Sequence, residues 1–294
     1  MLWSKNIRII VKKQISIREG TKSDENYVND ICKGVFNSND YLPKIWKNWI
    51  KDKNGKFFVG MYERIPISIY HLYFECKQAW MEALRVKKEF RKDGIGRMLL
   101  EDAIHRTQEY NSIKLLTDTD NRAALNLFEE FSFSSLSQQT MYWKPRIRNT
   151  LKNTTNEKSS SVEIKVMSPN EMEMILKKSY GNSDLIPIWW RFWDSNDEVI
   201  KHIANRALGY SITRGAEQGQ VILLNTTKYD FRKTLHLIHF NKSELVNEII
   251  EKISKDYNEY TIFAFQEKNH DSNDILKENG FNERLEIVIL ERKI

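Results

Sequence analysis

The sequence predicts an α/β protein made of two similar domains, each a twisted mixed β-sheet (α+β in character) flanked by helices. Three observations predict this fold: strand-like and helix-like segments follow one another in both halves, a polar segment separates the halves, and two residue patterns occur once in each half. The chain has 294 residues, enough for two ordinary domains. We expect a first domain at residues 1–145, a linker at 146–160 and a second domain at 161–294.

The first half carries the clearer pattern of secondary structure. Period-two alternation and short apolar runs predict strands, whereas apolar residues three and four apart predict helices. The helical segment after residue 94 places Ile95, Met98, Leu99 and Ala103 on one face. The expected order is a strand at 14–20, two helices within 21–50, strands at 56–63, 66–75 and 79–86, a helix from 94, a strand at 112–117, a helix at 121–131 and a strand at 139–145.

The second half repeats this order more faintly. Strands are expected at 162–167, 218–226, 233–240, 260–265 and 285–292, and helices at 168–179 and 243–257.

Two patterns recur between the halves. The pattern D-x-x-P-x-x-W-x-x-W occurs at 40–49 and again at 184–193, 144 residues later. The segments 121–133 and 269–281 both begin with asparagine and end with phenylalanine, 148 residues apart. We expect an internal duplication in which each tryptophan pair lies on one helical face and serves mainly in packing.

The composition argues against several classes of protein. The chain has 46 Lys and Arg against 40 Asp and Glu, and the net charge of +6 is spread along the sequence, so we expect no nucleic-acid partner. It contains no apolar run of membrane-spanning length and no signal-peptide core at its start, so we expect a cytoplasmic protein without a membrane partner. The two cysteines and six histidines show no metal-binding spacing, so we expect no metal.

The segment 83–100, ALRVKKEFRKDGIGRMLL, carries the clearest chemical signal. Arg91, Gly94 and Gly96 form the pattern R-x-x-G-x-G between a predicted strand and a predicted helix. Glycines let a ligand approach the backbone closely, and the N–H groups at a helix N-terminus bind phosphate oxygens. Basic neighbours add positive charge. The sequence therefore predicts a phosphate-binding loop, in preference to a basic turn that precedes a solvated helix.

These residues resemble a known family. LRVKKEFRKDGIGRMLL is similar to motif A of the GNAT superfamily of N-acetyltransferases, TDNRAALNLFEEFSF resembles its motif B, and the order of elements at 14–145 matches the family. The resemblance implies an acetyl-CoA-dependent transferase, with acetyl-CoA as the acyl-donor substrate. The segment DYLP…W…W, followed by EALRVKKEFRKDGIGR, also looks like the histidine N-acetyltransferases and their relatives, which carry a further C-terminal region.

The second half looks like a degenerate second GNAT domain. The residues RKDGIG at 91–96 correspond to HFNKSE at 239–244, which contains no glycine. We therefore expect this half to bind no CoA.

The resemblance also implies which residues bind CoA. In the family, loop N–H groups hold the pyrophosphate, the backbone of the preceding strand bonds the pantetheine arm and thioester, and motif B contacts the arm. The implied set is Leu84, Arg85, Val86, Arg91, Lys92, Asp93, Gly94, Ile95, Gly96, Arg97, Asn121 and Phe128. Phe128 stands where the family often has a tyrosine that protonates the leaving thiolate. Because a phenyl ring has no proton to give, another group acts as the acid or the thiolate leaves to water.

Glu82 is the candidate general base. It lies on the strand at 79–86, where strict alternation puts it on the same face as Leu84 and Val86. A carboxylate beside a half-buried pocket can accept a proton from an amine, whereas a solvated glutamate would have no such role. Tyr142 is a second candidate, as an acid or a substrate contact, or else a core residue.

The acceptor side in this family includes the region 36–50. We expect Asp40, Tyr41 and Trp46 to bind substrate there. The resulting hypothesis is transfer of acetyl to a primary amine of a small molecule, such as the amino acid histidine, by direct attack in a ternary complex of a monomer or homodimer. The alternatives are a non-catalytic acyl-CoA-binding or regulatory module and a protein N-terminal or lysine acetyltransferase.

Overall fold

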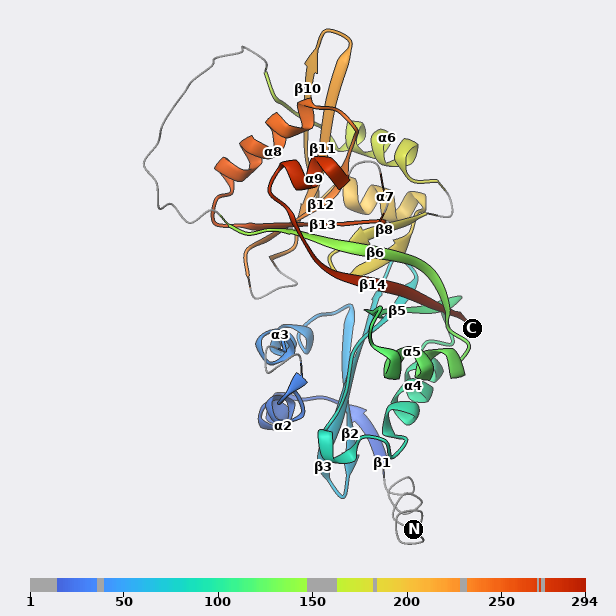
Figure 1. The fold of residues 1–294 in the computed structure, drawn as a ribbon. Helices are drawn as coiled ribbons and strands as arrows, with labels where there is room; N and C mark the ends of the chain where they lie inside the picture. The colour runs from blue at the N-terminus through green and yellow to red at the C-terminus, as the bar shows by residue number, and fades with distance from the viewer. Residues whose placement is uncertain are drawn as a thin grey trace. The chain divides into compact units, whose positions relative to one another are not determined.

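The computed structural model describes residues 15–35, 40–146, 163–181, 184–227, 232–268, 270 and 273–294 (Figure 1). The chain forms two compact units. The first contains the described residues up to Thr117, together with Asn121–Leu136 and Leu290–Ile294, and the second contains Asp118–Asp120 and the described residues within Ser137–Ile289. Each unit thus includes a segment from the other half of the chain. Apart from Arg146, the expected linker lies outside the described residues.

The first unit is built on a mixed sheet. Its strands lie in the order β1 (Ile15–Glu19), β2 (Gly55–Tyr62), β3 (Ile65–Glu75), β4 (Gln78–Val86), β5 (Ser112–Asp118) and the end of β14 (Asn282–Lys293). Strands β1 to β4 pair in antiparallel fashion, whereas β4 and β5 are parallel because α4 connects them. The mixed sheet flanked by helices confirms the predicted fold class for this half.

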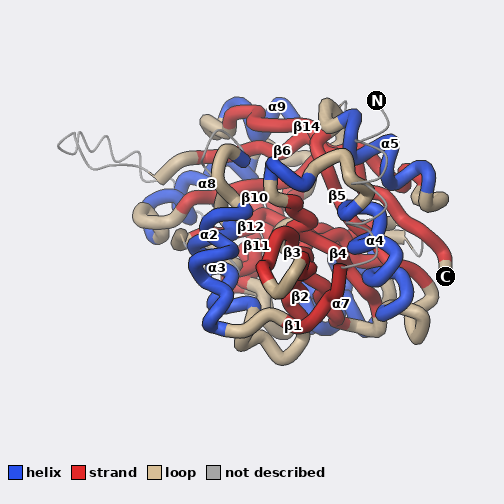
Figure 2. The backbone as a smooth tube through the Cα atoms, turned by 90° about the horizontal axis from the view of Figure 1, so that it is seen from below, coloured by secondary structure: helices blue, strands red, loops and turns tan. Residues whose placement is uncertain are grey.

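Helices cover both faces of this sheet, as Figures 1 and 2 show. One face carries α2 (Glu25–Ile31) and α3 (Leu42–Trp49), and the other carries α4 (Ile95–Arg106) and α5 (Arg122–Glu130). Local chemistry fixes where they begin. Thr21 and Asp24 form the predicted capping box on the short 3-10 helix Lys22–Asp24 that precedes α2. Pro43 lies in the first turn of α3, as expected.

The core of the first unit is aromatic on both faces of the sheet. Trp46 of α3 and Trp80 of β4 are buried, and Phe58 stacks on Tyr70 with ring centroids 4.8 Å apart. On α4, the buried residues are Ile95, Leu99, Leu100 and Ala103, so Leu100 takes the core position that was predicted for Met98. The buried face of α4 is therefore slightly rotated from the face that the sequence predicts.

The second unit is a sheet of similar design. Its strands lie in the order β14, β6 (Ser134–Lys144), β13 (Thr261–Gln266), β12 (Thr234–Phe240), β11 (Glu217–Asn225), β10 (Leu208–Arg214) and β7 (Lys165–Val166). Strands β12 and β13 are parallel, and the pairs on either side of them are antiparallel. Helices α8 (Leu245–Asp256) and α9 (Asn273–Glu278) bury their apolar residues in the same cluster as Tyr210 and Leu237.

Helices α6 (Pro169–Ser179) and α7 (Asp197–Ala204) complete this unit. Ser168 and Glu171 form a capping box at the start of α6, with Pro169 in its first turn, as the sequence predicts. A side chain at Gly209 of β10 would collide with Met172 of α6, so the helix packs directly on the strand there. The prediction missed α7 and β10, although α7 buries Val199, Ile200, Ile203 and Ala204 on one face and Leu208, Tyr210 and Ile212 alternate along β10.

The second tryptophan pattern does not form a helix. Residues 184–193 lie in a hairpin of β8 (Leu185–Ile188) and β9 (Arg191–Asp194), and Trp189 in the turn has a φ of +60°. The expectation that Trp190 and Trp193 share a helical face is therefore wrong. The turn is held by a buried histidine, since the backbone N–H of Trp189 donates to His236 Nδ1 at 2.9 Å. In element order, the counterpart of α3 is α7.

The second repeated pattern corresponds to a shared local geometry. Helix α5 is followed by Ser132 with a φ of +61°, and α9 is followed by Gly280 with a φ of +77°. In both places the next residue donates its N–H back into the helix: Phe133 to Phe128 O and Phe281 to Leu276 O, each at 3.0 Å. The spacing of 148 residues therefore marks the same helix ending in each half.

Candidate active site

Strands β4 and β5 separate where the predicted site begins. Their parallel pairing covers two positions, Ala79 with Ile113 and Trp80 with Lys114, although β4 continues to Val86 and β5 to Asp118. Ala83 has a φ of +58°, and the register between β3 and β4 shifts there. One extra residue on β4 therefore forms a β-bulge. The rest of β4, Leu84 to Val86, is not paired with β5, which leaves its edge open toward the loop that follows.

The bulge changes which side chains share a face. Residues that pair across antiparallel strands lie on one face, and Glu82 pairs with His71 while Arg85 pairs with Ile69. His71 and Ile69 are two residues apart on β3, so Glu82 and Arg85 share a face. Leu84 lies on the other face, where its Cδ2 would be 3.9 Å from a side chain at Gly96 of α4. The prediction that Glu82 faces the same way as Leu84 and Val86 is therefore wrong.

The R-x-x-G-x-G segment connects β4 to α4, as predicted. Its path is set by two left-handed residues, Lys92 with a φ of +68° and Gly94 with a φ of +80°, and Gly94 is the N-cap of α4. Arg91 Nε donates to Val86 O at 2.9 Å, so this side chain ties the loop to the end of the strand. Asp93 is partly buried in the same loop. The first backbone N–H groups of α4 follow directly, which is the arrangement that binds phosphate oxygens.

Gly96 is a glycine that the fold itself does not require. A Cβ placed on it would lie 3.5 Å from Leu127 Cδ2 and 3.9 Å from Leu84 Cδ2, both ordinary contact distances. Glycine in a helix is less favourable than alanine by about 0.5–1 kcal/mol. An alanine would therefore fit here, whereas glycine leaves the backbone open to the close approach that a phosphate would need.

Arg97 follows on the same helix turn. It forms an ion pair with Glu130 and lies 5.2 Å from the centre of the Phe131 ring.

The opposite face of β4 carries the candidate base. Glu82 Oε1 lies 2.9 Å from His71 Nδ1, and the side chains are 12% and 0% exposed. His71 stacks on Trp49 of α3, with ring centroids 4.2 Å apart and planes 18° from parallel. A carboxylate that is near the surface and bonded to a buried imidazole can accept a proton.

Asp40 and Tyr41 lie at the start of α3, and residues 36–39 of the predicted acceptor region are outside the described residues. Asp40 is buried: one carboxylate oxygen accepts from Leu42 N at 3.1 Å, and the other accepts from Arg85 Nε at 3.0 Å. Burial opposes the charge on Arg85, but the neighbouring Tyr41 and Asp40 raise its pKa. Tyr41 is half-buried and packs edge-on against Trp49 at 6.1 Å. Asp40, Tyr41, Arg85 and Glu82 thus gather around one side of α3.

The remaining predicted residues of the first unit have structural contacts. Trp46 is fully buried and packs against Phe57, with ring centroids 6.0 Å apart. Asn121 is the N-cap of α5: its Oδ1 accepts from Ala124 N at 3.3 Å, and its Nδ2 donates to Thr117 Oγ1 at 3.0 Å. Phe128 is buried against Phe133.

Tyr142 lies in the core of the second unit, on β6. It is 1% exposed and donates to Glu283 Oε1 at 3.3 Å. Burial, together with the charge of Glu283, raises the pKa of Tyr142 to about 12.

The second unit builds the start of α8 differently from the start of α4. The N-cap of α8 is Glu244, with a φ of −59°, where α4 has a left-handed glycine. The Ser243 hydroxyl accepts from Leu245 N at 3.2 Å, so a side chain already bonds one of the first helical N–H groups. A carboxylate beside these groups disfavours a second anion.

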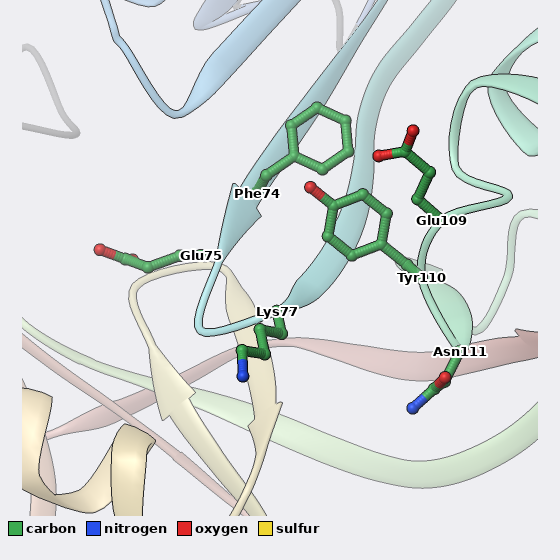
Figure 3. A pocket seen from close by; sticks show the side chains of 6 residues that line it. All are labelled: Phe74, Glu75, Lys77, Glu109, Tyr110 and Asn111. Atoms are coloured by element: carbon green, nitrogen blue, oxygen red, sulfur yellow. The ribbon is translucent and has the colours of Figure 1, made fainter.

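A surface pocket lies at the other ends of β4 and α4 from the glycine loop. Figure 3 shows its lining side chains: Phe74, Glu75, Lys77, Glu109, Tyr110 and Asn111. The rings of Phe74 and Tyr110 stack with centroids 5.0 Å apart.

In the part of the chain that the structure describes, no group of three or more His, Cys, Asp or Glu residues could hold a metal ion. No helix among the described residues is both long and apolar enough to cross a membrane.

Sequence reasoning did not single out His71. The available signal was a histidine in the middle of the apolar strand segment IYHLYF, at a position where neighbours on both sides are buried. A polar residue in such a strand must find a partner, and Glu82 on the neighbouring strand provides it.

Comparison with known proteins agrees with this geometry. Residues 25–133 match the protein-family model of the acetyltransferase (GNAT) family. The structure is similar to a GCN5-related N-acetyltransferase from Sphaerobacter thermophilus, with a TM-score of 0.63 and 8% identity over 95% of this chain and 96% of that one. It is also similar to a GCN5-related N-acetyltransferase from Anabaena variabilis, with a TM-score of 0.50 and 12% identity over 95% of this chain and 72% of that one.

A sequence comparison with curated proteins gave no significant match. Identities as low as those of the two structures show a shared fold, and this shared fold extends over both halves of the chain. The family match and the site geometry together carry the assignment of the first half. Residues 25–133 therefore form an acetyltransferase (GNAT) domain.

Proposed function

We propose that the protein transfers an acetyl group from acetyl-CoA to a primary amine of a small molecule, in a ternary complex without a covalent enzyme intermediate. The observation that carries this proposal is the sequence of bulged strand, open strand edge and left-handed Gly94 that leads into α4. Bound acetyl-CoA supplies a reactive thioester.

The residues of the loop fit the phosphates of such a donor. The first N–H groups of α4 bind phosphate oxygens with the help of the helix dipole, and the absence of a side chain at Gly96 permits close approach. Arg91 lies exposed beside them. The backbone of Leu84 to Val86, at the open edge of β4, is positioned to hydrogen-bond an extended arm.

On the other face of β4, Glu82 accepts the proton that the attacking amine must lose. As the new C–N bond forms and the C–S bond breaks, the thiolate takes a proton from water, because the buried Phe128 has none to give. Tyr41 and the Arg85–Asp40 pair line the side of α3 on which the acceptor would lie. An amino acid such as histidine is one acceptor that would suit this mixed polar and aromatic surface.

A free-thiol release assay with acetyl-CoA tests the proposal. The panel contains amino acids including histidine, polyamines and peptides with free N-termini. We expect turnover with a small amine, and we expect Glu82→Gln to lower the rate chiefly at low pH, where the unprotonated amine is scarce. Measurable CoA binding without turnover of any amine would instead support an acyl-CoA-binding or regulatory module. Turnover of peptides alone would support an N-terminal or lysine acetyltransferase.

A further inference from the structure

We propose that His71 is a positioning residue for acetyl transfer, which holds the Glu82 carboxylate ionised and in one orientation, ready to accept a proton. This inference rests on the proposed function, because it takes Glu82 as the base. The two residues lie opposite each other on β3 and β4, and Nδ1 of the imidazole is 2.9 Å from Oε1 of the carboxylate. An ionised carboxylate only accepts hydrogen bonds, so the imidazole carries its proton on Nδ1 and donates it.

The surroundings of His71 fix its ring. One face stacks on Trp49 at 4.2 Å, and the ring edge touches β2, because a Cβ placed on Gly55 would lie 2.6 Å from Nε2. The rings of Phe57 and Tyr73 lie 6.4 Å and 6.5 Å away. Packing on these sides fixes the orientation of the ring, with Nδ1 toward Glu82.

Other titratable side chains lie near the pair. Strand β3 brings Tyr73, strand β4 brings Arg85, and the start of α3 brings Asp40 and Tyr41. Arg85 and Asp40 neutralise each other through their 3.0 Å contact.

Beside β2, Asp52 lies near the same glycine that His71 touches: a Cβ on Gly55 would lie 3.4 Å from Asp52 Cβ.

Two variants of nearly equal size separate this role from packing. In His71→Asn the amide nitrogen occupies about the place of Nδ1 and can still donate, whereas His71→Leu has no donor. Both remove the ring that stacks on Trp49, so they share the structural loss. One charge-assisted hydrogen bond is equivalent to about one pH unit in the titration of its acceptor. We therefore expect the acidic limb of kcat/KM against pH to move up by about one unit in His71→Leu and to stay near the wild-type position in His71→Asn.

The KM for acetyl-CoA should be unchanged in both variants, since the glycine loop is built on the other face of β4. Equal shifts in both variants, or none in either, would overturn the proposal and leave His71 a packing residue.

Two measurements do not depend on turnover. The titration of Glu82 can be followed by NMR in protein labelled with ¹³C-glutamate, with its signal identified by its loss in Glu82→Gln. Its midpoint should rise in His71→Leu relative to His71→Asn. In unmutated protein, ¹⁵N NMR of the imidazole should show the proton on Nδ1, and a proton on Nε2 would contradict the proposal even if neither variant folds. If no amine is turned over, the proposed function fails, while these titrations still decide whether His71 acts on Glu82.

Discussion

Replacing Gly96 by alanine should stabilise the protein and weaken its binding of CoA. Gly96 is the second residue of α4, and the added methyl group would meet Leu127 and Leu84 at 3.5 Å and 3.9 Å, which are ordinary contact distances. Alanine favours a helix more than glycine does. We therefore expect the free energy of unfolding to rise by about 0.5–1 kcal/mol.

The effect on binding has the opposite sign. If a phosphate group lies against the backbone at Gly96, the methyl group takes the space of a phosphate oxygen. At least one charge-assisted hydrogen bond from a helix N–H is then lost, which is worth about 1.5–3 kcal/mol. The dissociation constant for CoA should rise roughly 10- to 100-fold.

Calorimetric titration with CoA measures the loss of affinity, and urea unfolding of the same preparations measures the gain in stability. Gly181→Ala is a matched control: its Cβ would meet Asp184 Oδ2 at 3.5 Å, again an ordinary contact, and the residue lies in the second unit. This control should leave the affinity for CoA unchanged. A Gly96→Ala protein that is more stable and binds CoA as tightly as the wild type would refute close approach at this glycine.

Three further predictions concern stability. Trp46→Ala should destabilise the first unit by about 3–5 kcal/mol in urea unfolding, because it empties a fully buried site; a loss below about 1 kcal/mol would contradict that burial. Lys114 and Glu291 are 1% and 5% exposed and form a buried ion pair at 3.3 Å. Lys114→Met or Glu291→Leu alone should lower the free energy of unfolding by about 3–5 kcal/mol, and the double variant should lower it much less. Losses that simply add in the double variant would refute the coupling. Hydrogen bonds, chiefly from Lys165, lower the pKa of Glu171 to about 2 from its ordinary 4.5, so its contribution is full above that ordinary value and is lost as pH falls through about 2. Glu171→Gln should flatten this part of the stability–pH curve, and an unchanged curve would refute the assignment.

Much of the fold could be predicted because local signals agreed with the tertiary structure. Capping boxes at Thr21 and Ser168 and the glycine at position 94 mark helix starts through chemistry that is complete within a few residues. The glycine loop could be located for the same reason, since its glycines, the strand before it and the helix after it are adjacent along the chain. The segment 184–193 failed because its proline and tryptophans fit a helix or a hairpin equally well, and contacts with His236 on a distant strand select the hairpin.

The sequence by itself determined the α/β order of elements, the glycine loop that leads into α4 and the GNAT motifs within residues 25–133, because each depends on residues close together along the chain. Only the tertiary structure decided how the candidate base, Glu82, is held. A single extra residue at Ala83 turns Glu82 away from Leu84, and pairing with β3 brings it to His71, 11 residues earlier in the chain. Period-two reasoning cannot anticipate a bulge, since the bulge forms where two strands with different numbers of residues must still pair.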